Sequence, residues 1–245
     1  MDANQIHDVV EQIIAVLASK GSIDKIELLF QKLSHANILK VSRMYTALTG
    51  SLLDEELQLI YRKDPPKQLI SLLMPMDILL STQIRKSVEG AGTDESSLIL
   101  LVMLASPAQR DQVKLTYKNL YNVSVYDDIC GDISNSPWEQ VIKKQFEPSY
   151  SQFDPNSPVT GRNLLHALLQ PDDKFTSIQD KIDPQEIKKM KEPTRTVFSL
   201  SFLRNNFEKK IQIAEEYSKS LQNGLVKYKD RAELIINAFK RDLDL

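Results

Sequence analysis

The sequence predicts an all-α protein built from repeats, and three observations lead to this fold class. Apolar residues recur at the spacing of an amphipathic helix, as at Ile6, Val9, Val10, Ile13, Ile14 and Leu17. Strand-like alternation is scarce, and only 7 of the 245 residues are glycine. A shift of the first third of the chain by 72 residues brings it into register with the second third without a gap.

The internal repeat rests on identities that keep their order at one offset. Ser34 falls on Ser106, Tyr45 on Tyr117, Leu48 on Leu120 and Ile70 on Ile142. The acidic pair Glu55-Glu56 falls on Asp127-Asp128, which favours a solvated helix face over paired catalytic carboxylates. Each unit of about 72 residues is therefore predicted to fold into several short helices.

The second unit is predicted to contain five helices. They span residues 77–88, 93–104, 107–120, 125–130 and 138–146. Thr93 is the predicted N-cap of the second helix, because its hydroxyl can accept a hydrogen bond from an unpaired backbone N–H. Asp94 and Glu95 would then lie in the first turn, where the helix dipole favours negative charge.

A third unit follows at a less regular offset, with Tyr217 lying 100 residues after Tyr117. About 28 extra residues precede it, and their Pro- and Asp-rich composition is typical of a linker, with a reduced repeat as the alternative. The predicted organisation is a repeat at 1–75, a repeat at 76–150, a linker or reduced repeat at 151–182, and a degenerate repeat at 183–245.

Composition and charge exclude several classes of protein. The chain is 42% hydrophobic and 26% charged with a net charge of −2, which is ordinary for a soluble protein and argues against a nucleic-acid binder. The longest apolar run, 98–105, is too short to span a bilayer, so membrane contact is expected to be peripheral. The single cysteine, Cys130, fits a reducing compartment, and the N-terminus shows no secretory signal pattern.

No arrangement of residues in the sequence predicts an enzyme. The three histidines, His7, His35 and His166, are far apart and lack the spacing of a metal-binding helix motif. The sequence also contains no Gly-x-x-x-x-Gly-Lys phosphate loop, and Cys130 is interpreted as a small loop residue. We therefore expect a binding protein.

The stretch 88–95, which reads Val-Glu-Gly-Ala-Gly-Thr-Asp-Glu, joins two predicted helices and is the most informative part of the chain. Gly90 and Gly92 let the backbone turn tightly and aim carbonyl oxygens at one point. Ca²⁺ takes about six to eight oxygen ligands, and Asp132, 40 positions after Gly92, can complete the shell. The stretch therefore predicts a calcium site. C-cap glycines are the alternative, which explains one glycine but not two with a spaced acid.

These motifs together resemble the annexin family, whose repeat has about this length and five helices. The resemblance is carried by Gly90–Glu95, Leu98–Leu101, Gln109-Arg110, Tyr117–Leu120 and Asp132. It is specific in the second unit, weaker in the first and faint in the third. The chain is thus similar to a divergent annexin, such as the giardin-like annexins of protists, which implies right-handed superhelical packing of the repeats. Annexins typically carry four repeats, whereas three are visible here.

The resemblance also implies the ligands of the calcium loop. The carbonyls of Val88, Gly90 and Gly92 and the carboxylate of Asp132 would bind Ca²⁺, with water or a lipid phosphoryl oxygen in the remaining positions.

Other residues match further positions of the family. The Thr93 carbonyl and the Glu95 carboxylate match a weaker accessory site, and Arg85 matches a basic residue beside the lipid headgroup. Glu89 departs from the lysine common there, which makes the metal more necessary for binding anionic lipid. Trp138 is expected to face the core, with insertion into the membrane interface as the alternative.

The other two units are predicted to bind no ion. In the first unit Ala18 and Lys20 stand in place of the two glycines, and Ile60 stands in place of Asp132. In the third unit the loop 190–194 has no glycine.

The expected function is calcium-dependent peripheral binding to acidic phospholipid at the cytoplasmic face of membranes. The alternative is a scaffold of the same fold that binds cytoskeletal or other protein partners with little need for calcium. Self-association on the membrane is a further possibility that the sequence leaves open.

Overall fold

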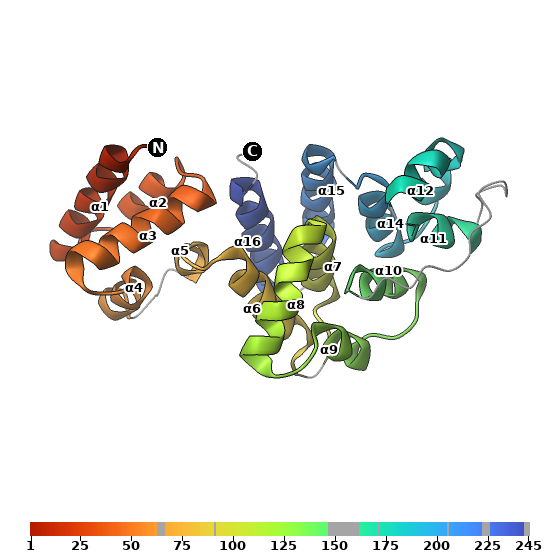
Figure 1. The fold of residues 1–245 in the computed structure, drawn as a ribbon, viewed down its shortest axis with the longest axis horizontal. Helices are drawn as coiled ribbons and strands as arrows, with labels where there is room; N and C mark the ends of the chain where they lie inside the picture. Colours follow the sequence, from red (N-terminus) through yellow and green to blue (C-terminus); the bar gives the residue numbers. More distant parts are fainter. Residues whose placement is uncertain are drawn as a thin grey trace. The chain divides into compact units, whose positions relative to one another are not determined.

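In the computed structural model, all regular secondary structure among the described residues is helical (Figure 1). The described residues are 1–62, 67–90, 92–146, 162–170, 172–204, 206–221 and 226–242. The helices are α1 (Ala3–Ala18), α2 (Asp24–Phe30), α3 (His35–Thr49), α4 (Leu53–Ile60), α5 (Lys67–Leu72), α6 (Met76–Val88), α7 (Glu95–Leu104), α8 (Pro107–Tyr121), α9 (Val125–Asp132), α10 (Pro137–Phe146), α11 (Arg162–Leu168), α12 (Asp172–Ile178), the 3-10 helix η1 (Gln179–Lys181), α13 (Pro184–Lys188), α14 (Thr194–Phe202), α15 (Phe207–Ser220) and α16 (Val226–Asp242). The all-α prediction is confirmed.

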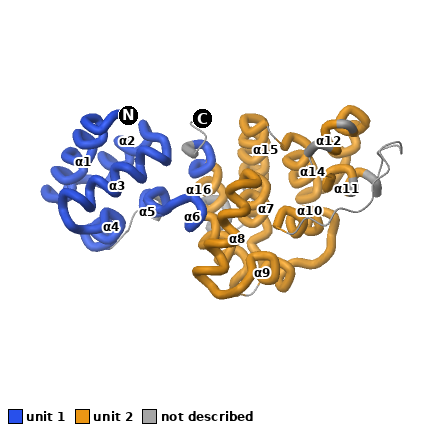
Figure 2. The backbone as a smooth tube through the Cα atoms, viewed as in Figure 1, with its two compact units in different colours: residues 1–79, 237–245 blue, residues 80–236 orange. Residues whose placement is uncertain are grey.

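Apart from the division into sequence repeats, the chain forms two compact units, which Figure 2 shows in different colours. The first comprises Met1–Leu79 together with Asn237–Leu245, and the second comprises Leu80–Ile236.

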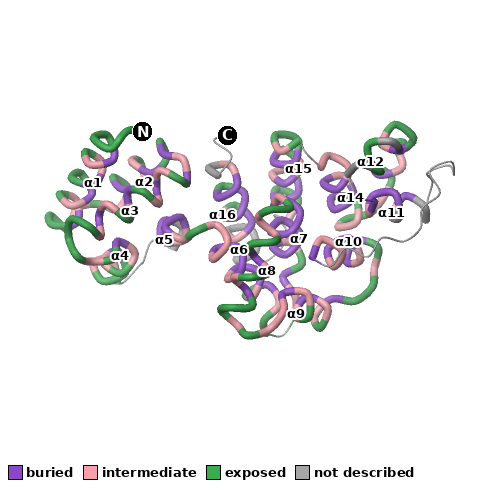
Figure 3. Tube along the Cα trace, in the orientation of Figure 1, coloured by how far each residue is buried: buried purple, intermediate pink, exposed green. Residues whose placement is uncertain are grey.

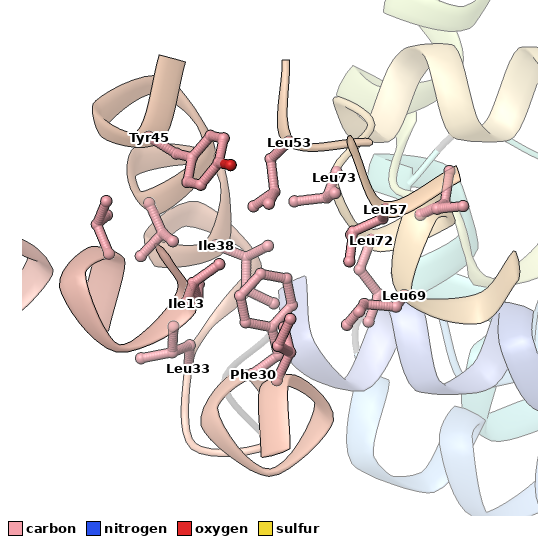
Figure 4. Packing of buried hydrophobic residues seen from close by; sticks show 14 of the residues in the cluster. Ile13, Phe30, Leu33, Ile38, Tyr45, Leu53, Leu57, Leu69, Leu72 and Leu73 are labelled. Atoms are coloured by element: carbon pink, nitrogen blue, oxygen red, sulfur yellow. The ribbon is translucent and has the colours of Figure 1, made fainter. Parts of the chain in front are cut away.

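The core of the first unit is made by one apolar face from each of its short helices. Of the apolar positions with helical spacing in α1, Ile6, Val10, Ile13 and Leu17 are buried, and Val9 and Ile14 are partly buried against the same core. Figure 4 shows Ile13, Phe30, Ile38 and residues of α4 and α5 pointing into the same cluster. The amphipathic pattern of the sequence is thus the pattern of burial.

The 72-residue offset reappears in the helix boundaries. Helices α3 and α8 begin and end 72 residues apart, and so do α4 and α9. The N-cap serines Ser34 and Ser106 each accept a hydrogen bond from the backbone N–H three residues later. The residues after these helices, Gly50 and Asn122, both adopt the left-handed conformation, with φ of 76° and 56°.

One tertiary hydrogen bond is also repeated at this offset, and it corrects the prediction that both acidic pairs are solvated. Tyr45 donates to the carboxylate of Glu56, and Tyr117 donates to Oδ2 of Asp128 over 2.6 Å. Only the first acid of each pair is exposed. The prediction failed because each tyrosine comes from the preceding helix, 11 residues earlier in the chain.

Helix α7 is the central element of the second unit. Every residue from Ser97 to Leu104 is buried, and the helix packs against α10, α14 and α15 (Figure 3). A helix that is apolar on all sides needs neighbours on all sides, which explains the long apolar run in the sequence. Among the described residues, no helix is both long enough and apolar enough to cross a membrane.

The segment 151–182, expected to be a linker or a reduced repeat, contains α11, α12 and η1 within its described part. Leu164, Phe175 and Ile178 are buried, and α11 packs against α14. Residues 151–161 and 171 of that segment lie outside the described residues. Within the degenerate repeat predicted at 183–245, the described residues form α13, α14, α15 and α16.

Candidate calcium site

The two glycines of the predicted calcium loop both adopt backbone conformations that side chains rarely allow. Helix α6 ends at Val88, and the chain then passes through Gly90 with φ of +112° and Gly92 with φ of +94°. A β-carbon added to either glycine would meet no described atom within 4 Å beyond its chain neighbours, so the glycines are needed for the turn of the backbone and not for close packing. A simple C-cap accounts for one such residue, not for both. Ala91, between them, lies outside the described residues.

The N-cap of α7 is Asp94, and the prediction of Thr93 was wrong by one residue. Asp94 Oδ1 accepts a hydrogen bond from the backbone N–H of Ser97 over 3.1 Å, and Oδ2 accepts one from its hydroxyl over 2.8 Å. The backbone N–H of Asp94 donates to the carbonyl of Ser87 over 2.8 Å, which closes the loop at its base. Asp and Thr are both good N-cap residues, and here the Asp94 carboxylate makes the capping hydrogen bond.

The Thr93 hydroxyl is instead the link between the loop and the distant acid. It donates a hydrogen bond to Oδ2 of Asp132, the last residue of α9. The structure therefore places Asp132 against the residue that follows Gly92. Helix α9 also includes Cys130, which the sequence placed in a loop.

The electrostatics of this place suit a cation. The final carbonyls of a helix have no intrahelical partner and carry the negative end of its dipole. Helix α6 ends at Val88, where the loop begins, and α9 ends at Asp132, which accepts the hydrogen bond from Thr93 in that loop. The Asp132 carboxylate adds a full negative charge at the unfavourable end of its own helix, and α9 has no basic residue in its last turn to offset it.

Main-chain oxygens would have to supply most ligands of such a cation. In the described part of the chain, no three His, Cys, Asp or Glu side chains form a group that could hold a metal ion. A loop of carbonyls closed by one carboxylate fits the oxygen preference of Ca²⁺.

Glu95, the predicted accessory ligand, lies in the first turn of α7, and its pKa is affected by the carboxylate of Glu139. Partial burial raises the pKa of Glu95, and the nearby charge of Glu139 raises it further. Glu139 lies in α10, where its two carboxylate oxygens accept hydrogen bonds from the backbone N–H groups of Ser134 and Ser136 over 3.0 and 2.6 Å. These bonds fix the loop that follows Asp132.

Because of Glu139, the stability of the protein should depend on pH in the acidic range. Burial raises its pKa, but hydrogen bonds from Ser136 and Ser134 and the charge of Lys143 outweigh burial, so the pKa lies below its usual 4.5. Its contribution is therefore complete above pH 4.5 and is lost as the pH falls through the lower pKa of the folded state. We expect Glu139→Gln to flatten the fall of the urea unfolding midpoint below pH 4.5. An unchanged acid slope would contradict this role.

Arg85, which resemblance alone placed beside a lipid headgroup, makes three contacts within the protein. Its Nη1 lies 2.5 Å from Oδ2 of Asp128, and its Nη2 lies 3.6 Å from Oε1 of Glu89. Its guanidinium also lies over the ring of Tyr121, 5.6 Å from the ring centre. Trp138 is 5% exposed, which agrees with the expected core position.

A second ion pair, which no pattern in the sequence predicts, lies at the loop. Nη1 of Arg231, in α16, lies 2.7 Å from Oδ2 of Asp94, and both side chains are largely buried. The two residues are 137 positions apart, so no local pattern could have paired them.

Comparison with known proteins shows a similarity to annexins in sequence and in fold. The family model described as Annexin matches residues 81–137, which contain the loop, Asp94 and Asp132. Among solved structures, calcium-bound alpha-1 giardin superposes with a TM-score of 0.75 over 96% of this chain and 85% of the other, at 14% identity. Annexin III superposes with a TM-score of 0.68 over 95% of this chain and 81% of the other, at 17% identity.

The chain is thus annexin-like in sequence over this stretch and in fold. Annexin E1 of Giardia intestinalis is 25% identical over 190 residues, which are 76% of this chain and 52% of that protein. Annexin A4 of Sus scrofa is 33% identical over 66 residues, which are 27% of this chain and 20% of that protein. The chain thus spans about half or less of the length of these curated relatives.

The corresponding loops of the first and third sequence repeats lack features of the loop after α6. Ile60, which takes the place of Asp132, ends α4 and packs against the apolar core of the first unit. In the third unit the N-cap position before α14 is Pro193, which makes no side-chain capping bond.

Proposed function

We propose that this annexin-like protein binds Ca²⁺ at the loop after α6 and uses the ion to attach to acidic phospholipid. The ligands are the carbonyls of Val88, Gly90 and Gly92 and the carboxylate of Asp132, and the Thr93 carbonyl and the Glu95 carboxylate serve a weaker accessory position. The observation that carries the proposal is the hydrogen bond from Thr93 to Asp132, which joins the glycine loop to the acid 40 residues after Gly92. Any bound ion would supply positive charge where two helix ends and a carboxylate meet.

The membrane step follows from the same chemistry. Ca²⁺ accepts more oxygen ligands than the loop offers, so lipid phosphoryl oxygens can complete its shell. The protein has a net charge of −2, and Glu89 lies beside the loop, so direct attraction to anionic lipid is weak. The ion therefore acts as the bridge, and binding is peripheral, at the anionic cytoplasmic leaflet.

A scaffold role is the second candidate, because two of the three annexin-like repeats lack the features of a calcium loop. The first has Ile60 in place of the acid, and the third has no glycine at 190–194. A single site implies modest affinity unless the membrane contributes ligands.

The two candidates differ in how vesicle binding depends on calcium. The full chain is sedimented with vesicles of phosphatidylserine and phosphatidylcholine in calcium or in chelator, with pure phosphatidylcholine vesicles as the control. Calorimetric titration of the lipid-free protein with Ca²⁺ provides an independent measurement of the site. Pelleting only with calcium and phosphatidylserine is the expected result. Equal pelleting in calcium and in chelator, or none in either, would favour the scaffold.

A further inference from the structure

The ion pair between Arg85 and Asp128 lies one helical turn from the proposed calcium site on both helices that build it. Arg85 precedes Val88, the last residue of α6, by three positions, and Asp128 precedes Asp132, the last residue of α9, by four. Residues three or four apart lie on the same face of a helix. The 2.5 Å contact between Nη1 and Oδ2 therefore joins the same faces of α6 and α9 that end at the site.

The surroundings of this pair make it a strong one. The Arg85 and Asp128 side chains are 33% and 18% exposed, so solvent screens them less than a pair on the open surface. Tyr117 donates a second hydrogen bond to the same Asp128 oxygen over 2.6 Å. Burial and the Asp128 charge hold the pKa of Tyr117 well above its usual value, so its phenol keeps the donated proton.

A comparison within the chain separates the role of the arginine from that of the tyrosine. The first sequence repeat has the equivalent hydrogen bond from Tyr45 to Glu56, so the tyrosine–carboxylate pair serves the fold of both repeats. Helix α1, which takes the place of α6, contains no lysine or arginine. The first unit also lacks the glycines and the acid of the calcium loop. Of these two sequence repeats, only the second has both Arg85 and the proposed calcium ligands.

We infer that Arg85 and Asp128 are positioning residues for calcium: they hold the carbonyl end of α6 and the carboxylate end of α9 together before the ion binds. This inference rests on the proposed function and replaces lipid contact as the role of Arg85. Without an ion, the two helix ends and Asp132 repel one another. The ion pair opposes this repulsion, so less of the binding energy of Ca²⁺ is used to order the site.

The test measures calcium binding and lipid binding separately. Arg85→Met keeps the apolar stem and removes the charge, and Asp128→Asn removes the partner charge. Each variant should weaken Ca²⁺ binding by the lipid-free protein about tenfold or more, as the loss of partners that orient metal ligands commonly does. The double variant should be little worse than either single variant, because both remove the same contact. Sedimentation with phosphatidylserine vesicles at saturating calcium should remain as in wild type.

Lys86→Met is the matched control, because it removes the same charge from the next, exposed position of α6. It should leave lipid-free calcium affinity unchanged. Arg85→Lys should recover part of the affinity, since a lysine restores the charge but not the planar fork of arginine. Circular dichroism and thermal unfolding in chelator identify any variant that fails to fold, and Arg85→Lys then carries the comparison.

Two outcomes would overturn the inference while leaving the proposed function intact. Arg85→Met could bind Ca²⁺ with wild-type affinity and yet bind vesicles poorly at saturating calcium, which would assign Arg85 to the headgroup. It could also match wild type in both measurements, which would give the pair no role in the site. Failure of the wild-type protein itself to bind Ca²⁺ would instead overturn the proposed function together with this inference.

Discussion

Asp132→Asn is expected to abolish calcium-dependent binding to phosphatidylserine vesicles and to leave the fold intact. Asparagine preserves the size of the side chain and an oxygen that can accept the hydrogen bond from Thr93. It removes the single carboxylate of the proposed primary ligand set, and calcium affinity depends strongly on ligand charge. Lipid-free titration should show a loss of more than about a hundredfold, at or beyond the upper end of losses seen for second-shell partners.

The same substitution should have the opposite effect on stability when calcium is absent. Asp132 is the last residue of α9, where the helix dipole disfavours negative charge. Its removal should therefore stabilise the calcium-free protein slightly, by about 0.3–1 kcal/mol. Thermal unfolding in chelator measures this, and a stability lost together with calcium binding would show that Asp132 serves the fold instead of an ion.

Asp127→Asn is the matched control for charge. It removes one carboxylate from the same helix, but from the exposed first turn, where the dipole favours it. We expect unchanged calcium affinity and a small loss of stability. Wild-type vesicle binding by Asp132→Asn, or an equal loss of binding in both variants, would contradict the assignment of Asp132 as the ligand.

The features that local sequence could predict are those that depend on neighbours along the chain. The helix ends at Val88 and Leu104, the two glycines and the start of α8 at Pro107 all follow from periodicity and from backbone chemistry. The 72-residue offset extended this to the first unit, because equal spacing predicts equal helices.

The features that local sequence could not predict depend on partners that are distant in the chain. Thr93 and Asp94 are both suitable N-caps, and the choice between them is set by Asp132, which takes the threonine hydroxyl. Asp128 resembles a solvated acid until Arg85, 43 positions earlier, is placed beside it. In both cases the local sequence allows two roles for a residue, and a tertiary contact determines which role it has.

Arg231→Met is expected to destabilise the protein by about 3 kcal/mol, because it leaves a buried charge without its partner. Asp94 is 6% exposed, and Nη1 of Arg231 lies 2.7 Å from its Oδ2. After the substitution, the Asp94 carboxylate would keep the two hydrogen bonds from Ser97 and its N-cap position at α7. Water cannot replace the lost cation at so buried an oxygen, so the penalty falls on the folded state.

The double variant Arg231→Met with Asp94→Asn separates a lost attraction from an unpaired charge. Asparagine is also a good N-cap, so it keeps α7 capped while removing the uncompensated charge. We expect the double variant to recover most of the lost stability, since replacing both partners of a buried pair costs much less than removing one. Urea unfolding in chelator measures all three proteins without a contribution from bound calcium.

Arg195→Met provides the control for loss of an arginine at a more exposed ion pair. Its partner Glu192 lies within 2.5 Å, but the two side chains are 48% and 32% exposed, so the expected loss is below about 1 kcal/mol. A similar loss in Arg195→Met and Arg231→Met, or no recovery in the double variant, would contradict the role of burial. Recovery would show that Arg231 is required mainly because Asp94, the residue that ends the calcium loop and begins α7, is charged and buried.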